Sequence, residues 1–396
     1  MRRISIFGAT GSVGVNTVDL INRGGGRAAF DVVALSGGAN IALLAEQARN
    51  LGARIAVTAY PQHLDELRRA LEGSGVEAAA GPDALAEAAS RPTDWAMSAI
   101  VGVAGLRPTL ELAASTRVLA LANKESLVCA GALLRARCAA HKTRLLPVDS
   151  EHSALWQAMN GEDAAKVRRL ILTATGGPFR TWSLAQMANA TPAQAVAHPT
   201  WDMGQRISVD SASMFNKALE VIEAANLYDM PAAAIEVIVH PQAIVHSMVE
   251  FCDGAILAHL GTPDMRAPIG YALNWPDRAP LPVPPLNLET LRRLDFEPPD
   301  PLRFPALRLA RQVLAAGGGH GAAFNAAKEA ALDAFLAGQI GFLDMARLVE
   351  DVLDQPYVRA VITQIPRDLN TVLTIDTVAR NAAKDWIAKN KGLVSD

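Results

Sequence analysis

The sequence predicts an α/β protein with three parts: an N-terminal doubly wound parallel sheet, an α+β domain and a C-terminal α-helical bundle. Three observations predict this fold class. Short apolar runs alternate with Ala- and Leu-rich helical stretches over residues 1–148, polar and turn-forming motifs are dense in 149–274, and helical periodicity dominates 302–396. Strand–helix alternation indicates parallel strands, because each parallel pair needs a crossover connection, which is usually a helix.

The first part contains six expected strands, each a short apolar run bounded by turn-forming residues. They are Ile4–Phe7, Val32–Leu35, Ile55–Val57, Trp95–Val101, Val118–Ala122 and Leu145–Val148. Segments such as Ile41–Leu51 and Ala84–Ala89 lie between them and are expected to be helical.

In the second part, strand-like runs reappear at Ile235–Val239 and Ala243–Phe251. Residues 275–301 hold eight of the chain's 23 prolines, which is typical of a semi-rigid linker. Beyond the linker, apolar residues recur at i, i+3 or i+4, and i+7, so a small helical bundle is expected to bury these faces. The periodic segments are Phe324–Leu336, Leu343–Leu353 and Ile375–Trp386.

Composition excludes several classes of protein. The chain has 396 residues, half of them apolar, and a net charge of −3, which favours neither a nucleic-acid partner nor a basic membrane-surface patch. Its three cysteines form no CxxC motif, so neither a disulfide framework nor a thiolate zinc site is expected, and a reducing, cytoplasmic compartment fits best. An apolar strand begins at Ile4, which leaves no room for a signal peptide, and no apolar run is long enough to span a membrane.

A glycine-rich motif follows the first expected strand. Gly8-Ala9-Thr10-Gly11-Ser12-Val13-Gly14 has GxxGxxG spacing. Glycine permits a tight turn and lets backbone N–H groups approach a pyrophosphate at a helix N-terminus. Because the motif opens an alternating domain, it predicts a Rossmann-like nucleotide site rather than a glycine-rich turn without a ligand.

The end of the second expected strand bears on the choice of nucleotide. An NAD site normally has an Asp or Glu there for the ribose hydroxyls, but this segment reads Ser36-Gly37-Gly38-Ala39-Asn40. It also lacks the Arg or Lys that usually holds a 2′-phosphate. The backbone N–H groups of Gly37 and Gly38 and the Asn40 side chain are the remaining phosphate donors, so NADP is mildly favoured.

Three carboxylates are candidates for a cation site. Asp149 and Glu151 are two residues apart and would point to one side of an extended chain. A helix is expected to begin near Asp210 and to place Asn216 and Glu220 on one face. Three oxygen ligands without Cys or His predict Mg²⁺, Mn²⁺ or a similar ion, although isolated acids are often only solvated surface groups.

Other polar motifs are candidates for binding a phosphate. Ser211, Ser213 and Lys217 lie near the start of the expected helix, where an anion is stabilised. Thr173–Phe179 (TATGGPF) places hydroxyls in a Gly-Gly-Pro turn, and Ala197–Gly204 (AHPTWDMG) has the composition of either a mobile flap or a fixed loop anchored by a tryptophan. We interpret His240 and His246 as structural.

Several motifs in a fixed order resemble the 1-deoxy-D-xylulose 5-phosphate reductoisomerase family over nearly the whole chain. They are GATGSVG, Ala122–Leu127, Pro147–His152, Gly176–Phe179, His198-Pro199 with Trp201 and Met203-Gly204, Ile207–Glu220, His240–Gln242, His246–Met248 and Pro263–Arg266. The resemblance implies conversion of 1-deoxy-D-xylulose 5-phosphate to 2-C-methyl-D-erythritol 4-phosphate with NADPH and a divalent cation (Mg²⁺, Mn²⁺ or Co²⁺). It also implies a homodimer and a catalytic and dimerisation role for residues 149–274.

The resemblance also assigns roles to residues. The implied metal ligands are Asp149, Glu151 and Glu220. The implied catalytic residues are Lys124, Glu151, His198 and Lys217. Substrate contacts are implied for Lys124, Ser150, Glu151, Thr175, His198, Trp201 (in the flap), Ser211, Asn216, Lys217 and Glu220. Cofactor contacts are implied for Thr10, Gly11, Ser12, Val13, Gly38, Ala39, Asn40, Asn123, Glu125 and Gly204.

The sequence departs from the family pattern at three positions. Thr175 stands where serine is usual, and Ala39 stands where lysine or arginine is usual, which weakens the expected grip on the 2′-phosphate. The family's NAANE stretch is Asn325–Glu329 (NAAKE) here, which we interpret as a variation on a helix surface. Two alternatives stay open: another NADP-dependent oxidoreductase acting on a different phosphorylated sugar, and a catalytically silent NADP-binding protein.

Overall fold

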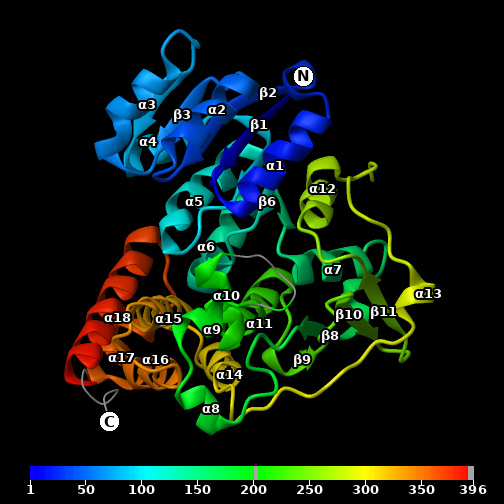
Figure 1. Cartoon of the computed structure of the whole chain (residues 1–396), viewed down its shortest axis with the longest axis vertical. Coiled ribbons are helices and arrows are strands. Elements are labelled where there is room, and N and C mark those ends of the chain that lie inside the picture. Colours follow the sequence, from blue (N-terminus) through cyan, green and yellow to red (C-terminus); the bar gives the residue numbers. More distant parts are fainter. Residues whose placement is uncertain (198, 200–203, 391–396) are drawn as a thin grey trace. The chain divides into compact units, whose positions relative to one another are not determined.

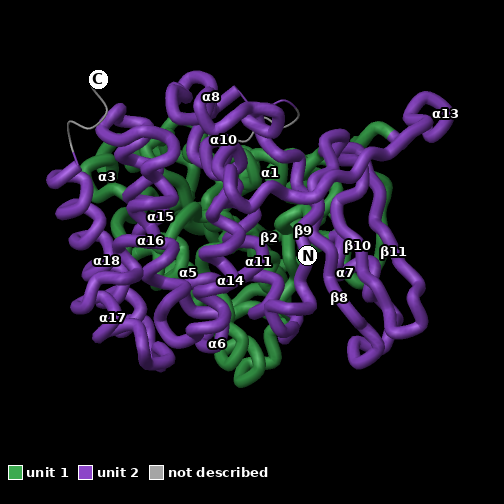
Figure 2. Tube along the Cα trace, turned by 90° about the horizontal axis from the view of Figure 1, so that it is seen from below, with its two compact units in different colours: residues 1–126, 134–153, 264–284 green, residues 127–133, 154–263, 285–396 purple. Residues whose placement is uncertain are grey.

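The computed structural model describes residues 1–197, 199 and 204–390. The chain divides into two compact units, shown in different colours in Figure 2. Unit 1 comprises residues 1–126, 134–153 and 264–284, and unit 2 comprises residues 127–133, 154–263 and 285–396. Each unit is described by itself.

Unit 1 is built on a seven-stranded parallel sheet, of which Figure 1 labels β1, β2, β3 and β6. The strand order is β4-β3-β2-β1-β5-β6-β7. Strands β2 to β4 extend the sheet on one side of β1, and β5 to β7 extend it on the other side. In sheets of this kind, the carboxyl ends of the strands at such a switch point form the usual ligand crevice. The strands are β1 (Arg2–Phe7), β2 (Phe30–Gly37), β3 (Ile55–Thr58), β4 (Glu77–Ala80), β5 (Thr93–Ser98), β6 (Thr116–Leu121) and β7 (Arg144–Pro147).

Helices flank this sheet, and their apolar faces form its core. The α4 helix packs against α5, and α1 packs against α12, which the chain supplies from far along the sequence. The buried Trp95 of β5 donates an Nε1–H hydrogen bond of 2.9 Å to the carbonyl of Ala272 in α12. The helices are α1 (Ser12–Arg23), α2 (Ile41–Leu51), α3 (Leu64–Leu71), α4 (Pro82–Ser90), α5 (Leu106–Ser115) and α12 (Arg266–Asn274).

Two helices contribute residues to both units. They are α6 (Lys124–His141), which begins in unit 1 and has residues 127–133 in unit 2, and α7 (Ser150–Ala158), which passes from unit 1 to unit 2 after Ser153. Non-helical dihedral angles at Ala130 (φ −146°, ψ 32°) break the regular course of α6.

Unit 2 contains a four-stranded mixed sheet with the order β11-β10-β8-β9. Strand β10 pairs antiparallel with β8 and β11, whereas β8 and β9 are parallel. The strands are β8 (Val167–Ala174), β9 (Ile235–Val239), β10 (Val245–Phe251) and β11 (Ile256–Leu260). Strand β11 forms one edge of the sheet.

The helices of unit 2 include two short ones with N-terminal capping boxes, α8 and α9. The C-terminal bundle centres on α15, which packs against α16 and α18. The helices are α8 (Leu184–Ala188), α9 (Pro192–Val196), α10 (Gln205–Ala212), α11 (Phe215–Tyr228), α13 (Leu288–Leu291), α14 (Ala306–Ala316), α15 (His320–Leu336), α16 (Asp344–Asp354), α17 (Pro356–Ile362) and α18 (Leu369–Asn390).

The predicted fold class is confirmed, with local differences. Strand β4 was not predicted because its sequence, EAAA, lacks the β-branched residues that mark strands. The predicted strands Val32–Leu35 and Ile55–Val57 lie within β2 and β3. Among the described residues, no helix is both long and apolar enough to cross a membrane.

The NAAKE variation does not lie on a helix surface, as the sequence had suggested. The Lys328 side chain is only 2% exposed, because its face of α15 packs into the bundle rather than toward solvent. Its ammonium group lies 2.8 Å from a carboxylate oxygen of Asp210 in α10. The variation therefore introduces a buried charge into unit 2.

Candidate active site

The nucleotide loop (residues 8–14) joins β1 to α1 and is held by backbone contacts. The Gly8 and Ala9 N–H groups donate hydrogen bonds to the Ser36 side chain and carbonyl, at 3.0 and 2.7 Å. Gly8 has φ +94°, and a Cβ atom at Gly14 would lie 2.1 Å from the Gly8 carbonyl oxygen. Glycine is therefore required at Gly8 and Gly14, and the spacing of the motif places a glycine at each of these two positions.

The segment after β2 contacts the nucleotide loop. A Cβ atom at Gly37 would lie 3.0 Å from the Thr10 side chain. The Asn40 side chain accepts a 3.2 Å hydrogen bond from the Leu43 N–H and caps α2. Asn40 therefore has a structural task that the sequence interpretation missed, although Asn followed by an apolar helix is a recognised capping signal.

Arg27 does not supply the base missing at Ala39. It precedes β2, whereas Ala39 follows the end of that eight-residue strand, so the two residues are separated by a strand about 25 Å long. The Arg27 side chain donates a 2.8 Å hydrogen bond to the Asn50 carbonyl. Arg27 is therefore not placed to hold a 2′-phosphate beside Ala39.

Asn123 organises the carboxyl end of β6. Its Oδ1 accepts a hydrogen bond from the Ser126 N–H and caps α6, while its Nδ2 donates to the Ile100 carbonyl at 2.6 Å and the Gly102 carbonyl at 3.0 Å. A third donation, of 2.9 Å, reaches the Glu125 carboxylate. This buried amide fixes the loop after β5 next to the start of α6.

Lys124 and Asp149 form an ion pair in unit 1. Lys124 begins α6, and Asp149 lies between β7 and α7, so the pair joins the ends of two neighbouring parallel strands. The buried His152 Nδ1 lies 3.9 Å from the Asp149 carboxylate. A lysine and a histidine therefore face this carboxylate within the unit.

Asp149 and Glu151 are not on an extended segment, so the expected i, i+2 geometry is wrong. Strand β7 ends at Pro147, and the Ser153 N–H already bonds to the Asp149 carbonyl at 2.8 Å. Glu151 lies in the first turn of α7, and Ser150 donates a hydrogen bond to its carboxylate. Carboxylates are stabilised at this end of a helix by the unpaired N–H groups and the helix dipole.

The expected helix beginning at Asp210 is two helices. Asp210 and Ser211 lie in the last turn of α10, and α11 begins at Phe215 after Met214, whose φ is +62°. Asp210 and Ser211 are therefore not N-cap residues. They end α10, and the chain turns at the left-handed Met214 before α11 begins. The turn position itself is a methionine rather than the glycine or asparagine that usually marks a left-handed residue, so the break between the two helices was not predicted.

Glu220 is the most buried carboxylate of this region, at 0% exposure. Lys217, which is 3% exposed, forms an ion pair with one of its oxygens, and the Asn216 amide donates a hydrogen bond to the other. The predicted shared face of Asn216 and Glu220 is thus confirmed. A carboxylate buried in this way needs a positive partner, because desolvation is costly for an unpaired charge.

The Gly-Gly turn after β8 packs on the end of α10. A Cβ atom at Gly177, whose φ is +64°, would lie 2.8 Å from the Ser211 carbonyl oxygen. The Gly177 N–H also contacts the Thr175 hydroxyl at 3.4 Å. The structure therefore gathers five predicted residues within one unit, the polar cluster of unit 2: Thr175, Ser211, Asn216, Lys217 and Glu220.

His198 and Trp201 lie outside the described residues. Gly204, with φ +74°, is described and is the N-cap of α10. His240 is buried, receives a 3.2 Å hydrogen bond from the Ile244 N–H and contacts the Asp295 carbonyl at 2.8 Å, in agreement with a structural role.

A glycine loop at the carboxyl edge of a parallel sheet, with the Lys124–Asp149 ion pair on the ends of two of its strands, is typical of the class of nucleotide-dependent enzymes. Three family profiles then identify the chain more closely. They are described as 1-deoxy-D-xylulose 5-phosphate reductoisomerase (residues 4–131), its C-terminal domain (145–228) and DXP reductoisomerase C-terminal domain (260–382). The chain belongs to the 1-deoxy-D-xylulose 5-phosphate reductoisomerase family, and the predicted family and enzyme class are confirmed.

Characterised sequences and solved structures agree with this assignment. The chain is 59% identical to a 1-deoxy-D-xylulose 5-phosphate reductoisomerase from Ruegeria pomeroyi over 99% of both chains, and 58% identical to one from Jannaschia sp. over 98% of both. It matches the Zymomonas mobilis enzyme in complex with NADPH at 48% identity with a TM-score of 0.90, covering 98% of this chain and 99% of that one. A DOX-P reductoisomerase in complex with NADPH, fosmidomycin and magnesium matches at 38% identity with a TM-score of 0.95, covering 99% and 100%.

Proposed function

We propose that this chain converts 1-deoxy-D-xylulose 5-phosphate to 2-C-methyl-D-erythritol 4-phosphate, using NADPH and a divalent cation, in non-mevalonate isoprenoid biosynthesis. The reaction and its cofactors follow from membership in the family. The observation in this chain that carries the proposal is the fully buried Glu220, held by Lys217 and Asn216. Such a carboxylate fits a cation-binding catalytic site and has no evident purpose in a silent scaffold.

The cation ligands in this proposal are Asp149, Glu151 and Glu220. The donor set fits Mg²⁺, Mn²⁺ or Co²⁺, because all three ligands are carboxylates and none is a thiolate. When bound, the cation supplies Lewis-acid stabilisation of the negative charge that develops on the substrate's oxygens. Lys124 orients Asp149, Lys217 and Asn216 orient Glu220, and the start of α7 orients Glu151.

The polar cluster of unit 2 supports binding of the substrate's phosphate. Ser211 and Thr175 supply hydroxyl donors, and Lys217 and Asn216 supply an ammonium and an amide near the start of α11, where an anion is stabilised. The remaining proposed substrate contacts are Lys124 and Ser150 of unit 1, together with His198 and Trp201, which lie outside the described residues. The phosphate takes no part in bond making, so its binding energy can hold the substrate and exclude water.

The nucleotide loop and the segment after β2 are the proposed NADPH site. The backbone N–H groups at the start of α1 suit the pyrophosphate, and Asn123 holds the adjoining loop in place. NADPH supplies hydride to the rearranged aldehyde. The proposed contacts are Thr10, Gly11, Ser12, Val13, Gly38, Ala39, Asn40, Asn123, Glu125 and Gly204.

The domain roles and the assembly state are also proposals. We assign 1–148 to NADP binding, 149–274 to catalysis and dimerisation, 275–301 to a linker and 302–396 to the helical domain. Edge strand β11 supports a homodimer, because Ile256, Leu257 and Leu260 are 48, 41 and 39% exposed on it. An exposed apolar edge of this kind favours association. A cytoplasmic location is supported by the scarcity and scatter of the cysteines, which form no CxxC motif.

An NADPH-oxidation assay tests this function directly. With 1-deoxy-D-xylulose 5-phosphate and Mg²⁺ or Mn²⁺, we expect loss of NADPH absorbance and formation of 2-C-methyl-D-erythritol 4-phosphate, identified by mass spectrometry and NMR. Omission of the cation, with chelator present, should abolish turnover. NADPH oxidation only with another phosphorylated sugar would favour a different oxidoreductase, and no oxidation with any sugar phosphate would favour a silent protein.

A further inference from the structure

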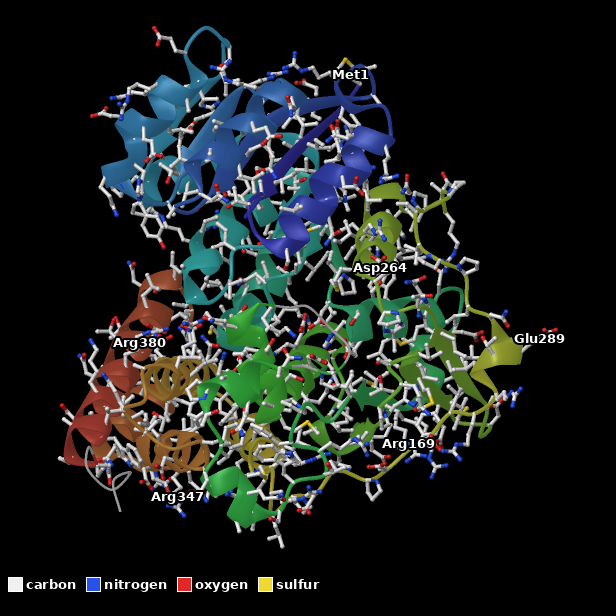
Figure 3. All side chains as sticks on the ribbon, viewed as in Figure 1. Met1, Arg169, Asp264, Glu289, Arg347 and Arg380 are labelled. Atoms are coloured by element: carbon white, nitrogen blue, oxygen red, sulfur yellow. The ribbon has the colours of Figure 1, made fainter. Side chains whose placement is uncertain are left out.

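A series of buried charges in unit 2 links α10, α15 and α18. Asp210, Lys328 and Glu329 are 6, 2 and 8% exposed, and Lys328 Nζ lies 2.8 Å from Asp210 Oδ2. Arg380, labelled on α18 in Figure 3, pairs with Glu329 at 2.5 Å and with Asp376 at 2.7 Å. None of these residues has a role in the site described above.

Burial makes the Lys328–Asp210 pair a strong constraint. Burial raises the pKa of Asp210, and the nearby Lys328 ammonium opposes this rise. For Glu329, burial also acts to raise the pKa, but Lys328 and Arg380 outweigh it and the pKa is lowered. Each charge therefore depends on its partner, and separating them would leave an uncompensated buried ion.

A second, exposed ion pair also ties α10 to α15. Arg206, in the first turn of α10, pairs with Asp333, and Asp210, in its last turn, pairs with Lys328. The first pair is exposed and screened by solvent, whereas the second is buried. The last turn of α10 is thus held more firmly than its first turn.

That last turn carries Ser211. The Gly177 turn packs on the Ser211 carbonyl, so the distance between Ser211 and Thr175 depends on where α10 ends. A shift of this turn toward or away from α15 would separate hydroxyl donors that must reach one phosphate. Misplacement of binding groups by about 1 Å can cost a hundredfold in rate.

We infer that Lys328 is a positioning residue: through Asp210 it fixes the end of α10, so that Ser211 meets the substrate's phosphate. This inference rests on the proposed phosphate site. Lys328 acts through the helix and not by touching the substrate. Asp210 transmits the constraint because it directly precedes Ser211.

The main test is the double variant Asp210→Asn with Lys328→Met, which removes both charges and so leaves no unpaired ion in the core. We expect KM for 1-deoxy-D-xylulose 5-phosphate and the inhibition constant of inorganic phosphate to rise together by roughly tenfold, while KM for NADPH stays within about twofold. The double variant Asp210→Asn with Lys328→Gln also removes both charges but keeps a hydrogen bond between the two side chains, so it should raise KM only two- to threefold, on the order of a neutral for a charged bond. Lys384→Met, at an exposed lysine of α18, is the matched control and should change none of these constants.

The outcomes separate positioning from general stability. If the double variant lowers Tm but leaves KM and phosphate inhibition unchanged, the pair only stabilises the fold and the inference is overturned. If Asp210→Asn with Lys328→Met does not fold, Asp210→Asn with Lys328→Gln, which keeps a hydrogen bond between the two side chains, decides the matter, and a fully lowered Tm with an unchanged KM in that variant overturns the inference. Should the wild type not turn over the substrate, the proposed function fails, and phosphate binding measured by calorimetry still tests Lys328.

Discussion

The nucleotide loop of unit 1 and the polar cluster of unit 2 are held in place by different means. The loop depends on backbone approaches that only glycine permits, such as the contact of Gly14 with the Gly8 carbonyl. The cluster depends on buried side chains of opposite charge, such as Lys217 and Glu220. The comparison teaches that the loop tolerates no added atom at Gly8 or Gly14, whereas the cluster tolerates no lost charge.

The largest effect is expected in the charge-based site. Glu220→Gln should keep the fold and NADPH binding but lower kcat on the order of a thousandfold or more, because it removes a charged cation ligand. Steady-state assays over a range of Mg²⁺ concentrations, with circular dichroism as a control for folding, measure this. Near-normal turnover at saturating Mg²⁺ would contradict the assignment of Glu220.

The next effect tests the backbone-based site. Gly14→Ala places a methyl group 2.1 Å from a carbonyl oxygen, so we expect roughly a hundredfold weaker NADPH binding and a lower Tm. Gly11→Ala is the control for stability, since Gly11 has φ −82° and its added Cβ would make an ordinary 3.5 Å contact. Fluorescence titration measures the NADPH affinity, and thermal melts measure Tm. Equal losses of Tm in the two variants would show that the close approach of Gly14 to the Gly8 carbonyl is not the cause of the lost stability.

Lys217→Ala should raise KM for the phosphorylated substrate strongly, by about tenfold or more, and also lower kcat. The substitution removes the ammonium group beside the proposed phosphate and leaves Glu220 with less compensating charge. KM for NADPH, measured in the same assays, should change little. The assignment to the phosphate site fails if KM for the sugar phosphate is unaltered.

A smaller effect is expected at the nucleotide end from Ala39→Arg. A guanidinium there can pair with the 2′-phosphate, so NADPH should bind about tenfold more tightly at low salt, with NADH almost unchanged. NADPH should already be preferred in the wild type, because no acid follows β2. KM for both cofactors at two ionic strengths is the measurement. An unaltered NADPH affinity would mean that another group already holds the phosphate.

The smallest effect contrasts two thiols, one in each unit. Burial raises the pKa of Cys138 in unit 1 to about 11, so only about one thiol in a thousand is ionised at pH 8. Cys252 in unit 2 is exposed and should react with a disulfide reagent within minutes. If the fold persists as the pH is raised toward 11, the labelling of Cys138 should speed up as its thiol ionises. Mass spectrometry of native protein at pH 8 should therefore find Cys252 modified and Cys138 intact.

The same comparison explains what the sequence could predict. Alternating apolar runs identified six strands of the parallel sheet, and glycine spacing located the nucleotide loop, because both patterns lie within short windows. The helical faces of α15, α16 and α18 were visible for the same reason. Strand β4 and the Met214 turn were missed because their residues carry no local signal.

The side-chain contacts of the site were less predictable. Asp149 and Glu151 were recognised as a pair, but the helix that begins at Ser150 was not, so their geometry was misjudged. Lys328 was misplaced on a surface because its partner, Asp210, is 118 residues away. A helical lysine is exposed in most proteins, and only the tertiary contact shows that this one is buried.

The pairing of Lys328 with Asp210 also restricts which substitutions this sequence can accept during evolution. Replacement of either residue alone leaves a buried charge without compensation, whereas a joint replacement does not. Accepted substitutions at the two positions should therefore occur together. In a library of single substitutions both positions would look invariant, although the two together remain free to change.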